Sequence, residues 1–229
     1  LKPYESIQLV GPNAKLNTVR GEHIRLAVLK RLYGTSGNLE DAVAISREMI
    51  SLAEAHPDMW VLYNNIAALT DNLVICQKLQ LVDEGNDTIK KLNKLKEQFT
   101  DRQVEIFNKS VSSLVPFFIS TGQFEKAMEI EGKTMECLKD IQIETTVRVR
   151  IYCAYASMYL QLKDYDKVLN WHNLFHEDKL GQAHVRHQVT MNCIAVATHF
   201  ELGNETVVES MARSCERQLS GMTIQVKIE

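Results

Sequence analysis

One pattern constrains this chain more than any other. An apolar helical face, a polar corner and a second apolar helical face recur about every forty residues. The clearest copy is residues 146–175, where the apolar spacing indicates two amphipathic helices joined by a tight corner at 162–165. Moving this stretch forward by about forty positions places Cys153 on Cys193 and Leu162 on Leu202. A period of this length indicates a helical array, in which each unit packs mainly against its neighbours.

The corners between paired helices share one chemistry. A glycine or a polar residue that tolerates a left-handed backbone ends the first helix, and a small or branched residue lies early in the second. The corners are at 37–42, 122–127, 163–168 and 203–208, and a weaker fifth corner is predicted at 85–87. About five helix-turn-helix units therefore fill the chain.

Residues around the corners resemble tetratricopeptide repeats. In that family a large residue in the first helix, a Gly-x-aromatic corner and a small residue early in the second helix recur together. One unit carries this signature through Phe118, Gly122, Phe124 and Ala127. Two others carry it through Tyr159, Tyr165 and Val168, and through Tyr33, Gly37, Leu39 and Ala42. The last two units, with HFELGNETVVESMARSC, also resemble bacterial members of that kind.

The resemblance implies an all-α fold, a right-handed α-α superhelix (solenoid) of about five antiparallel helix-turn-helix repeats. Residues 1–229 would form a single domain. Because the chain begins at Leu1 without Met, we expect it to be a fragment of a longer protein.

Apolar periodicity and helix-breaking residues predict the individual helices. We expect no strand, a loose lead-in over residues 1–12, and a proline, Pro116, inside the fifth helix. Gly85 is predicted to end the third helix, and Thr100 with Asp101 to cap the fifth. The predicted helices are about 14–33, 39–52, 57–82, 89–99, 100–120, 124–135, 143–162, 165–176, one from about 182, and 204–219.

Charge and cysteine content indicate the cellular compartment and the classes of partner that this chain can bind. A net charge of -3, a pI near 6.2 and the lack of a basic block argue against binding to nucleic acid or an anionic membrane. No apolar run approaches the roughly twenty residues that a membrane span needs. The five cysteines form no Cys-x-x-Cys pair and fall on apolar helical faces, so we expect reduced thiols in a cytoplasmic protein.

Sequence motifs for catalysis or cofactor binding do not occur. The glycines form no nucleotide-binding loop, and no cysteine lies beside a candidate base. His172, His176 and Glu177 were the strongest candidates for metal binding, but a metalloprotease spacing would need histidine where Leu180 stands. A polar helix end, where cationic side chains lie near the negative end of the helix dipole, explains these residues better than a metal site does. We therefore expect no enzyme activity, cofactor or bound metal.

The resemblance supplies candidate binding residues. In tetratricopeptide proteins the first helix of each unit lines a groove that holds an extended or helical peptide. The matching positions here are Lys109, Ser112, Arg150, Ser157, Gln161 and Thr190, with Asn64 and Asn65 added from a unit that aligns less clearly. The leading hypothesis is a non-catalytic module that binds a peptide or protein segment in this groove.

Two other functions remain open on the sequence alone. The chain could be a regulatory or sensor domain, in which a ligand or peptide changes solenoid curvature and so controls an output domain outside these residues. It could also be a structural piece that self-associates through the ends of its array. Flanking sequence would distinguish the first alternative, and the oligomeric state would distinguish the second.

Overall fold

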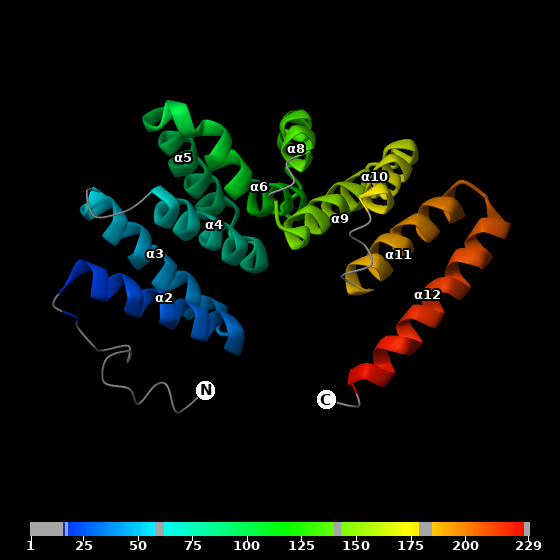
Figure 1. Cartoon of the computed structure of the whole chain (residues 1–229), viewed down its shortest axis with the longest axis horizontal. Coiled ribbons are helices and arrows are strands. Elements are labelled where there is room, and N and C mark those ends of the chain that lie inside the picture. Colours follow the sequence, from blue (N-terminus) through cyan, green and yellow to red (C-terminus); the bar gives the residue numbers. More distant parts are fainter. Residues whose placement is uncertain (1–15, 17, 58–61, 140–142, 179–184, 227–229) are drawn as a thin grey trace. The chain divides into compact units, whose positions relative to one another are not determined.

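The computed structural model describes residue 16 and residues 18–57, 62–139, 143–178 and 185–226. These residues are helical apart from short connections, and they contain no strand (Figure 1). The prediction of an all-α chain is therefore confirmed. Contacts divide the chain into two compact units, Leu1–Thr121 and Gly122–Glu229.

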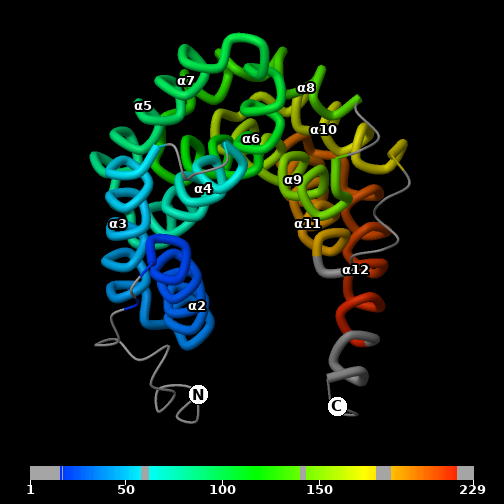
Figure 2. Tube along the Cα trace, turned by 60° about the vertical axis from the view of Figure 1, so that its left-hand side comes forward, coloured from blue at the N-terminus to red at the C-terminus, as the bar shows by residue number. Residues whose placement is uncertain are grey.

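The first unit consists of paired helices in two layers. Its elements are α2 (Val19–Ser36), α3 (Leu39–Ala55), α4 (Leu62–Leu79), α5 (Val82–Gln98), the 3-10 turn η2 (Thr100–Arg102) and α6 (Gln103–Ser120). Helix α4 packs against α3, α5 and α6, and Lys30 of α2 forms an ion pair with Asp71 of α4. Figure 2 shows α2 and α4 on one side of the unit and α3 and α5 on the other. The first helix of each pair thus lies beside the first helix of the next.

A glycine allows two helices of this unit to approach closely. Gly85 is buried within α5, and a Cβ atom added to it would lie 2.1 Å from Cζ of Phe117 on α6. Phe117 itself is fully buried. The aromatic ring therefore occupies the space where any other residue at position 85 would place its side chain.

The second unit repeats the paired arrangement. Its elements are α7 (Phe124–Glu129), α8 (Glu131–Leu138), α9 (Thr145–Gln161), α10 (Tyr165–Glu177), α11 (Val185–Glu201) and α12 (Glu205–Val226). Helix α9 packs against α10 and α11, and α11 packs against α10 and α12. The hydroxyl of Tyr155 on α9 donates to the backbone oxygen of Ala127 on α7 over 3.0 Å.

Aromatic side chains and one carboxylate connect α8, α9 and α10. Tyr155 stacks on Trp171 with ring centroids 4.5 Å apart and an interplanar angle of 6°. Glu131 of α8 accepts a hydrogen bond from the indole nitrogen of Trp171 at 3.0 Å and one from the hydroxyl of Tyr159 at 2.5 Å. Because buried polar groups are costly without partners, this carboxylate stabilises both aromatic positions.

Left-handed residues end the first helix of successive pairs. The prediction is confirmed at Gly37, Gly122 and Gly203, with φ of 81°, 72° and 73°, and at Lys163, with φ of 59°. The predicted corner at Gly85 is wrong, because α5 runs through it. The corner lies instead at Gln80, with φ of 56°, where the amide of Leu81 donates to the backbone oxygen of Cys76 over 2.9 Å.

With the corner at Gln80, the spacing between successive corners is nearly constant. The left-handed residues now run from 37 to 80, 122, 163 and 203, at intervals of 43, 42, 41 and 40 residues. They are also the only residues with positive φ in the part of the chain that the structure describes. Five equivalent corners are thus present, and the right-handed superhelix that they would build remains a prediction.

Some predicted helix ends also require correction. The helix predicted over 124–135 is divided at Ile130 into α7 and α8, and Gly132 beside the break has a low helix propensity. Thr100 and Asp101 form a 3-10 turn instead of a cap, and α6 begins at Gln103 with no side-chain cap. Pro116 lies inside α6, as predicted. The lead-in at 1–12 and the helix start predicted near 182 lie outside the described residues.

Candidate functional site

An exposed aromatic residue and a lysine meet on the first helices of unit one. Lys109, an exposed residue of α6, places its ammonium nitrogen 4.6 Å from the ring centroid of Tyr63 on α4. Tyr63 is 58% exposed, although tyrosine rings bury readily. The distance is within the range of a cation–π interaction, which attracts the two exposed side chains to each other by about 0.5–1 kcal/mol.

The sequence pattern groups Tyr63 with the apolar positions of the helix predicted over 57–82 and not with the candidate binding residues, and its exposed ring shows that this grouping is wrong. The buried residues Leu62, Ile66, Leu69 and Leu73 define the inward face of α4. Tyr63 is three positions before Ile66, but it lies at the margin of that face, about 100° around the helix from Leu62, and its ring is exposed. An exposed tyrosine offers a partner an apolar ring together with a polar hydroxyl, which is why tyrosine is common at interfaces.

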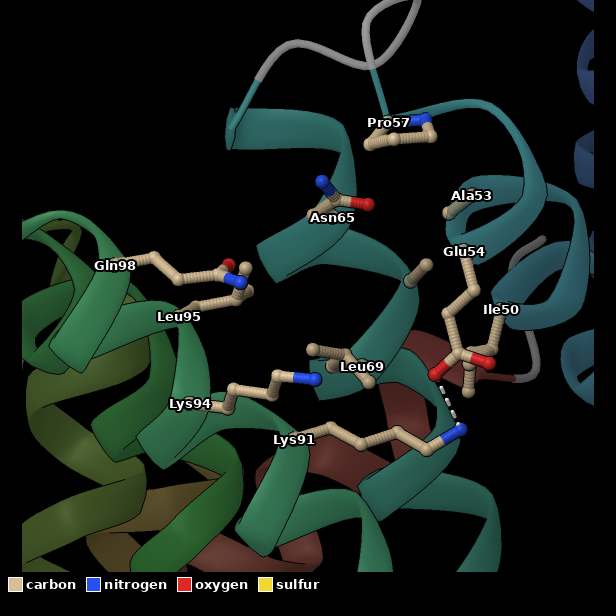
Figure 3. Close-up of a pocket in the computed structure, with 11 residues that line it drawn as sticks. Ile50, Ala53, Glu54, Pro57, Asn65, Leu69, Lys91, Lys94, Leu95 and Gln98 are labelled. Carbon is tan, nitrogen blue, oxygen red and sulfur yellow. Dashed lines mark ion pairs between the residues drawn. The ribbon is translucent and has the colours of Figure 1, made fainter.

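The other candidates of unit one divide between this face and a pocket behind it: Ser112 and Asn64 lie close in sequence to the pair, and Asn65 does not share its face. Ser112 is half-buried on α6, three residues after Lys109 and therefore on a neighbouring part of the same face. Asn64 is half-buried on α4 directly after Tyr63. Asn65 is also half-buried, and its side chain faces a pocket between α3, α4 and α5 (Figure 3).

The pocket has an apolar floor and a polar rim. Its volume is about 550 Å³, and Pro57 lies at its edge. The floor consists of buried side chains from α3 and α4 together with the half-buried Leu95 of α5: Ile50, Ala53, Ala68, Leu69 and Leu95. The rim carries the polar and charged side chains Glu54, Asn65, Lys91, Lys94 and Gln98.

The charged groups of the rim differ in their pairing. Lys91 and Glu54 form an ion pair of 2.7 Å. Lys94 has no ion pair or hydrogen bond within the described residues, and in Figure 3 its side chain reaches from α5 toward α4. The pocket therefore presents one positive charge that the described side chains leave uncompensated.

In unit two the candidates follow one face of α9 and continue on α11. Arg150 and Ser157 are half-buried, and Gln161 is exposed, with its amide donating to the backbone oxygen of Ser157 over 3.3 Å. Intervals of seven and four residues place these three side chains on one side of the helix. Thr190 is exposed on α11, which packs against α9. The candidate residues thus divide into one set on each unit.

The buried Cys76 and the half-buried Cys153 have poorly reactive thiols. Burial raises the pKa of the Cys76 thiol to about 12 and that of Cys153 to about 11. Both thiols therefore stay protonated near neutral pH, and a protonated thiol is a poor nucleophile. The prediction that every cysteine lies on an apolar face is wrong for Cys193, which is exposed.

His172 and His176 meet on one side of α10. Their Nε2 atoms are 3.1 Å apart, and burial, followed by the charge of His176, lowers the pKa of His172. Two imidazoles alone make an incomplete coordination shell for zinc. Among the residues that the structure describes, no group of three or more His, Cys, Asp or Glu side chains could hold a metal ion.

Comparison with models of protein families, with curated proteins and with solved structures finds no match to this chain. No helix within the described ranges has the length and apolar character to cross a membrane. The resemblance to tetratricopeptide repeats stays a prediction from the sequence pattern.

Proposed function

We propose that this chain is a non-catalytic, tetratricopeptide-like interaction module. It binds a peptide or protein segment along the first helix of each helix pair. The observation that carries the proposal is the contact between Tyr63 and Lys109. An aromatic ring that is 58% exposed beside a cation offers the residue types that often dominate binding energy at interfaces. Tyrosine has only two rotatable side-chain bonds, so such a ring loses little entropy when a partner binds.

Regular helix pairs support the repeat assignment. Left-handed corners at Gly37, Gln80, Gly122, Lys163 and Gly203 recur at nearly constant intervals. Stacked helix pairs of this kind present their first helices side by side as an extended surface, which repeat proteins use for binding. In unit one, α4 and α6 are neighbours in this way, and α4 carries Tyr63 while α6 carries Lys109.

The surface favours a segment with both apolar and acidic side chains. Lys109 can pair with a carboxylate while Tyr63 packs against an aliphatic side chain. Helix α2, which the ion pair between Lys30 and Asp71 connects to α4, exposes Ile24 and Val28 one turn apart. We therefore expect the ligand to be an amphipathic segment with at least one acidic residue.

Affinity capture with matched variants tests this proposal. The whole chain, Tyr63→Ala, Lys109→Glu and the control Lys133→Glu, which changes an exposed lysine of α8, would each be used as bait. Captured proteins would be compared by quantitative mass spectrometry, and the affinity of the strongest would be measured by titration. We expect both surface variants to weaken binding about tenfold or more, since anchor residues contribute above ~1.4 kcal/mol.

The same experiment can contradict the proposal. A partner that binds all baits equally would show that the face of α4 and α6 is not used. Arg150→Glu tests the face of α9 separately, because Arg150 belongs to the second unit. Loss of binding in that variant alone would move the site to unit two.

A regulatory domain is the second candidate function, and the pocket of about 550 Å³ between α3, α4 and α5 favours it. In this case a small ligand would alter an output domain outside these residues. Hydrogen exchange with and without a bound ligand tests the idea. Protection that extends from α4 and α5 to other helices supports regulation, and protection confined to the pocket contradicts it.

A further inference from the structure

The pocket between α3, α4 and α5 has the dimensions of a ligand site. Sites for small molecules usually enclose ~300–1,000 Å³ and combine an apolar lining with a few polar groups. The pocket encloses about 550 Å³, and Ile50, Ala68 and Leu69 supply its apolar floor. A ligand must therefore present an apolar body to that floor.

Charge on the rim selects the polar group of the ligand. Glu54 compensates Lys91 at 2.7 Å, which leaves Lys94 as the one rim cation without a described partner. A ligand with one negative charge would neutralise it. A cationic ligand would be repelled by Lys94, and a ligand with several negative charges would lack further partners among the described rim residues.

Two amides complete the polar rim. Asn65 of α4 and Gln98 of α5 line the pocket and have no side-chain hydrogen bond within the described residues. Figure 3 shows the side chains of Gln98 and Lys94 reaching from α5 toward α4. An amide nitrogen donates well to an anionic oxygen, so Asn65, Lys94 and Gln98 are rim side chains that can donate to a carboxylate.

From these observations we infer that the pocket binds a small amphipathic carboxylic acid. Its hydrocarbon or aromatic body lies against Ile50, Ala68 and Leu69, and its carboxylate pairs with Lys94 at the rim. This site is distinct in function from the peptide-binding face, which depends on Tyr63 and Lys109. It belongs wholly to the first unit, because α3, α4 and α5 do.

Titration of the whole chain with octanoate tests the inference. Nuclear magnetic resonance of backbone amides would follow binding, with octan-1-ol as the uncharged analogue and acetate as the anion without an apolar body. We expect octanoate to bind with a Kd of about 1 mM and to shift amides of α4 and α5. Octan-1-ol should bind about tenfold more weakly, because it lacks the charge-assisted hydrogen bonds. Acetate should not bind measurably.

Variants of the rim provide the controls. Lys94→Gln removes the charge at an exposed position and is expected to weaken octanoate binding about tenfold while leaving octan-1-ol unchanged. Lys90→Gln, on the same helix but paired with Asp87 and outside the pocket, should bind octanoate as the unaltered chain does. Equal octanoate affinity in Lys94→Gln and the unaltered chain would overturn the inference, as would the absence of binding to the unaltered chain.

A further arm separates a free acid from a chain end. A short peptide that ends in a leucine carboxylate would be titrated beside its C-terminal amide. Weaker binding of the peptide than of octanoate supports a free acid, and tighter binding of the peptide overturns that assignment. Lys109→Glu should leave octanoate binding unchanged, so failure of the peptide-binding proposal and failure of this one give different results.

Discussion

At the scale of single residues, Gly85 shows how strongly one neighbour can restrict a position. A methyl group there would lie 2.1 Å from Cζ and 2.2 Å from Cε2 of Phe117, far inside contact distance. We expect Gly85→Ala to lower the free energy of unfolding by about 2–3 kcal/mol, because α5 and α6 must separate or Phe117 must leave its rotamer. Urea denaturation followed by circular dichroism measures this change.

Gly132→Ala is the matched control for that substitution. Gly132 is exposed on α8, and an added Cβ atom meets nothing within 4 Å. Alanine has the higher helix propensity, so this variant should gain about 0.5–1 kcal/mol. Equal effects of the two substitutions would contradict the close approach of α5 to Phe117.

His172 gives the chain a predictable pH dependence. Burial and the charge of His176 lower its pKa below the ordinary 6.5, while asparagines at 192 and 173 favour the charged form and His199 opposes it. The unfolded chain therefore binds more protons than the folded chain at mildly acidic pH. Stability from this group is fully present above about pH 6.5 and is lost as the pH falls through the folded pKa.

Denaturation midpoints from pH 7.5 down to about 5 test this dependence. The unaltered chain should lose stability over this range, and His172→Gln should lose less, because glutamine does not titrate. His176→Gln retains the buried His172 and is expected to keep most of the dependence. Identical pH profiles for the unaltered chain and His172→Gln would rule out the assignment to this histidine.

At the scale of helices, the corner at Gln80 carries a backbone cost that the three glycine corners avoid and that Lys163 shares. Gln80 has a φ of 56°, whereas Gly37, Gly122 and Gly203 occupy the same position without a Cβ atom. We expect Gln80→Gly to raise the free energy of unfolding by about 1 kcal/mol, since the left-handed region costs other residues about that much. The hydrogen bond from its side chain to the backbone oxygen of Gln77, at 2.9 Å, would be lost and offset part of the gain.

Lys78→Gly, two residues earlier, serves as the control for the corner. Lys78 is exposed inside α4, where glycine should cost about 1 kcal/mol. Opposite signs at positions 78 and 80 would locate the left-handed residue by experiment. A destabilising effect at both positions would instead agree with a helix that continues to Gly85.

The helices and the corners between them differ in how well the sequence predicts them. Apolar spacing located the paired helices, since helix periodicity and core burial act on the same residues. Glycine marked three of the five left-handed corners, and a polar residue marked the one at Lys163. Gln80 was missed because its conformation is imposed by packing around Leu81 and Cys76, while Gly85 nearby offered a stronger local signal. The Gly85 contact depends on Phe117, which is distant in sequence.

Binding surfaces were less predictable for a related reason. The resemblance placed Lys109 and Asn65 among the candidates, but it could not indicate that one meets Tyr63 and the other lines a pocket. Both contacts join side chains from different helices. Neither a period nor a motif specifies which exposed side chains meet across a helix pair.

At the scale of the whole molecule, the division at Thr121 and Gly122 indicates two folding units. The apolar clusters of α3 with α4 and of α4 with α6 lie within the first unit, and the contacts of Glu131 with Trp171 and Tyr159 lie within the second. Because these contacts join helices of the same unit, each unit can bury a core of its own. We therefore expect fragments 1–121 and 122–229 each to unfold cooperatively in urea when they are expressed alone.

A single-tryptophan variant tests independence within the whole chain. The sequence has two tryptophans, so Trp60→Phe leaves Trp171 as a fluorescence probe of the second unit. If the units unfold independently, adding Gly85→Ala should lower the midpoint of one circular dichroism transition by about 1 M urea. The Trp171 midpoint should stay where it was, because Gly85 and Phe117 belong to the first unit. A Trp171 midpoint that falls with Gly85→Ala would instead indicate one cooperative array, in which loss of the contact between α5 and α6 destabilises every repeat.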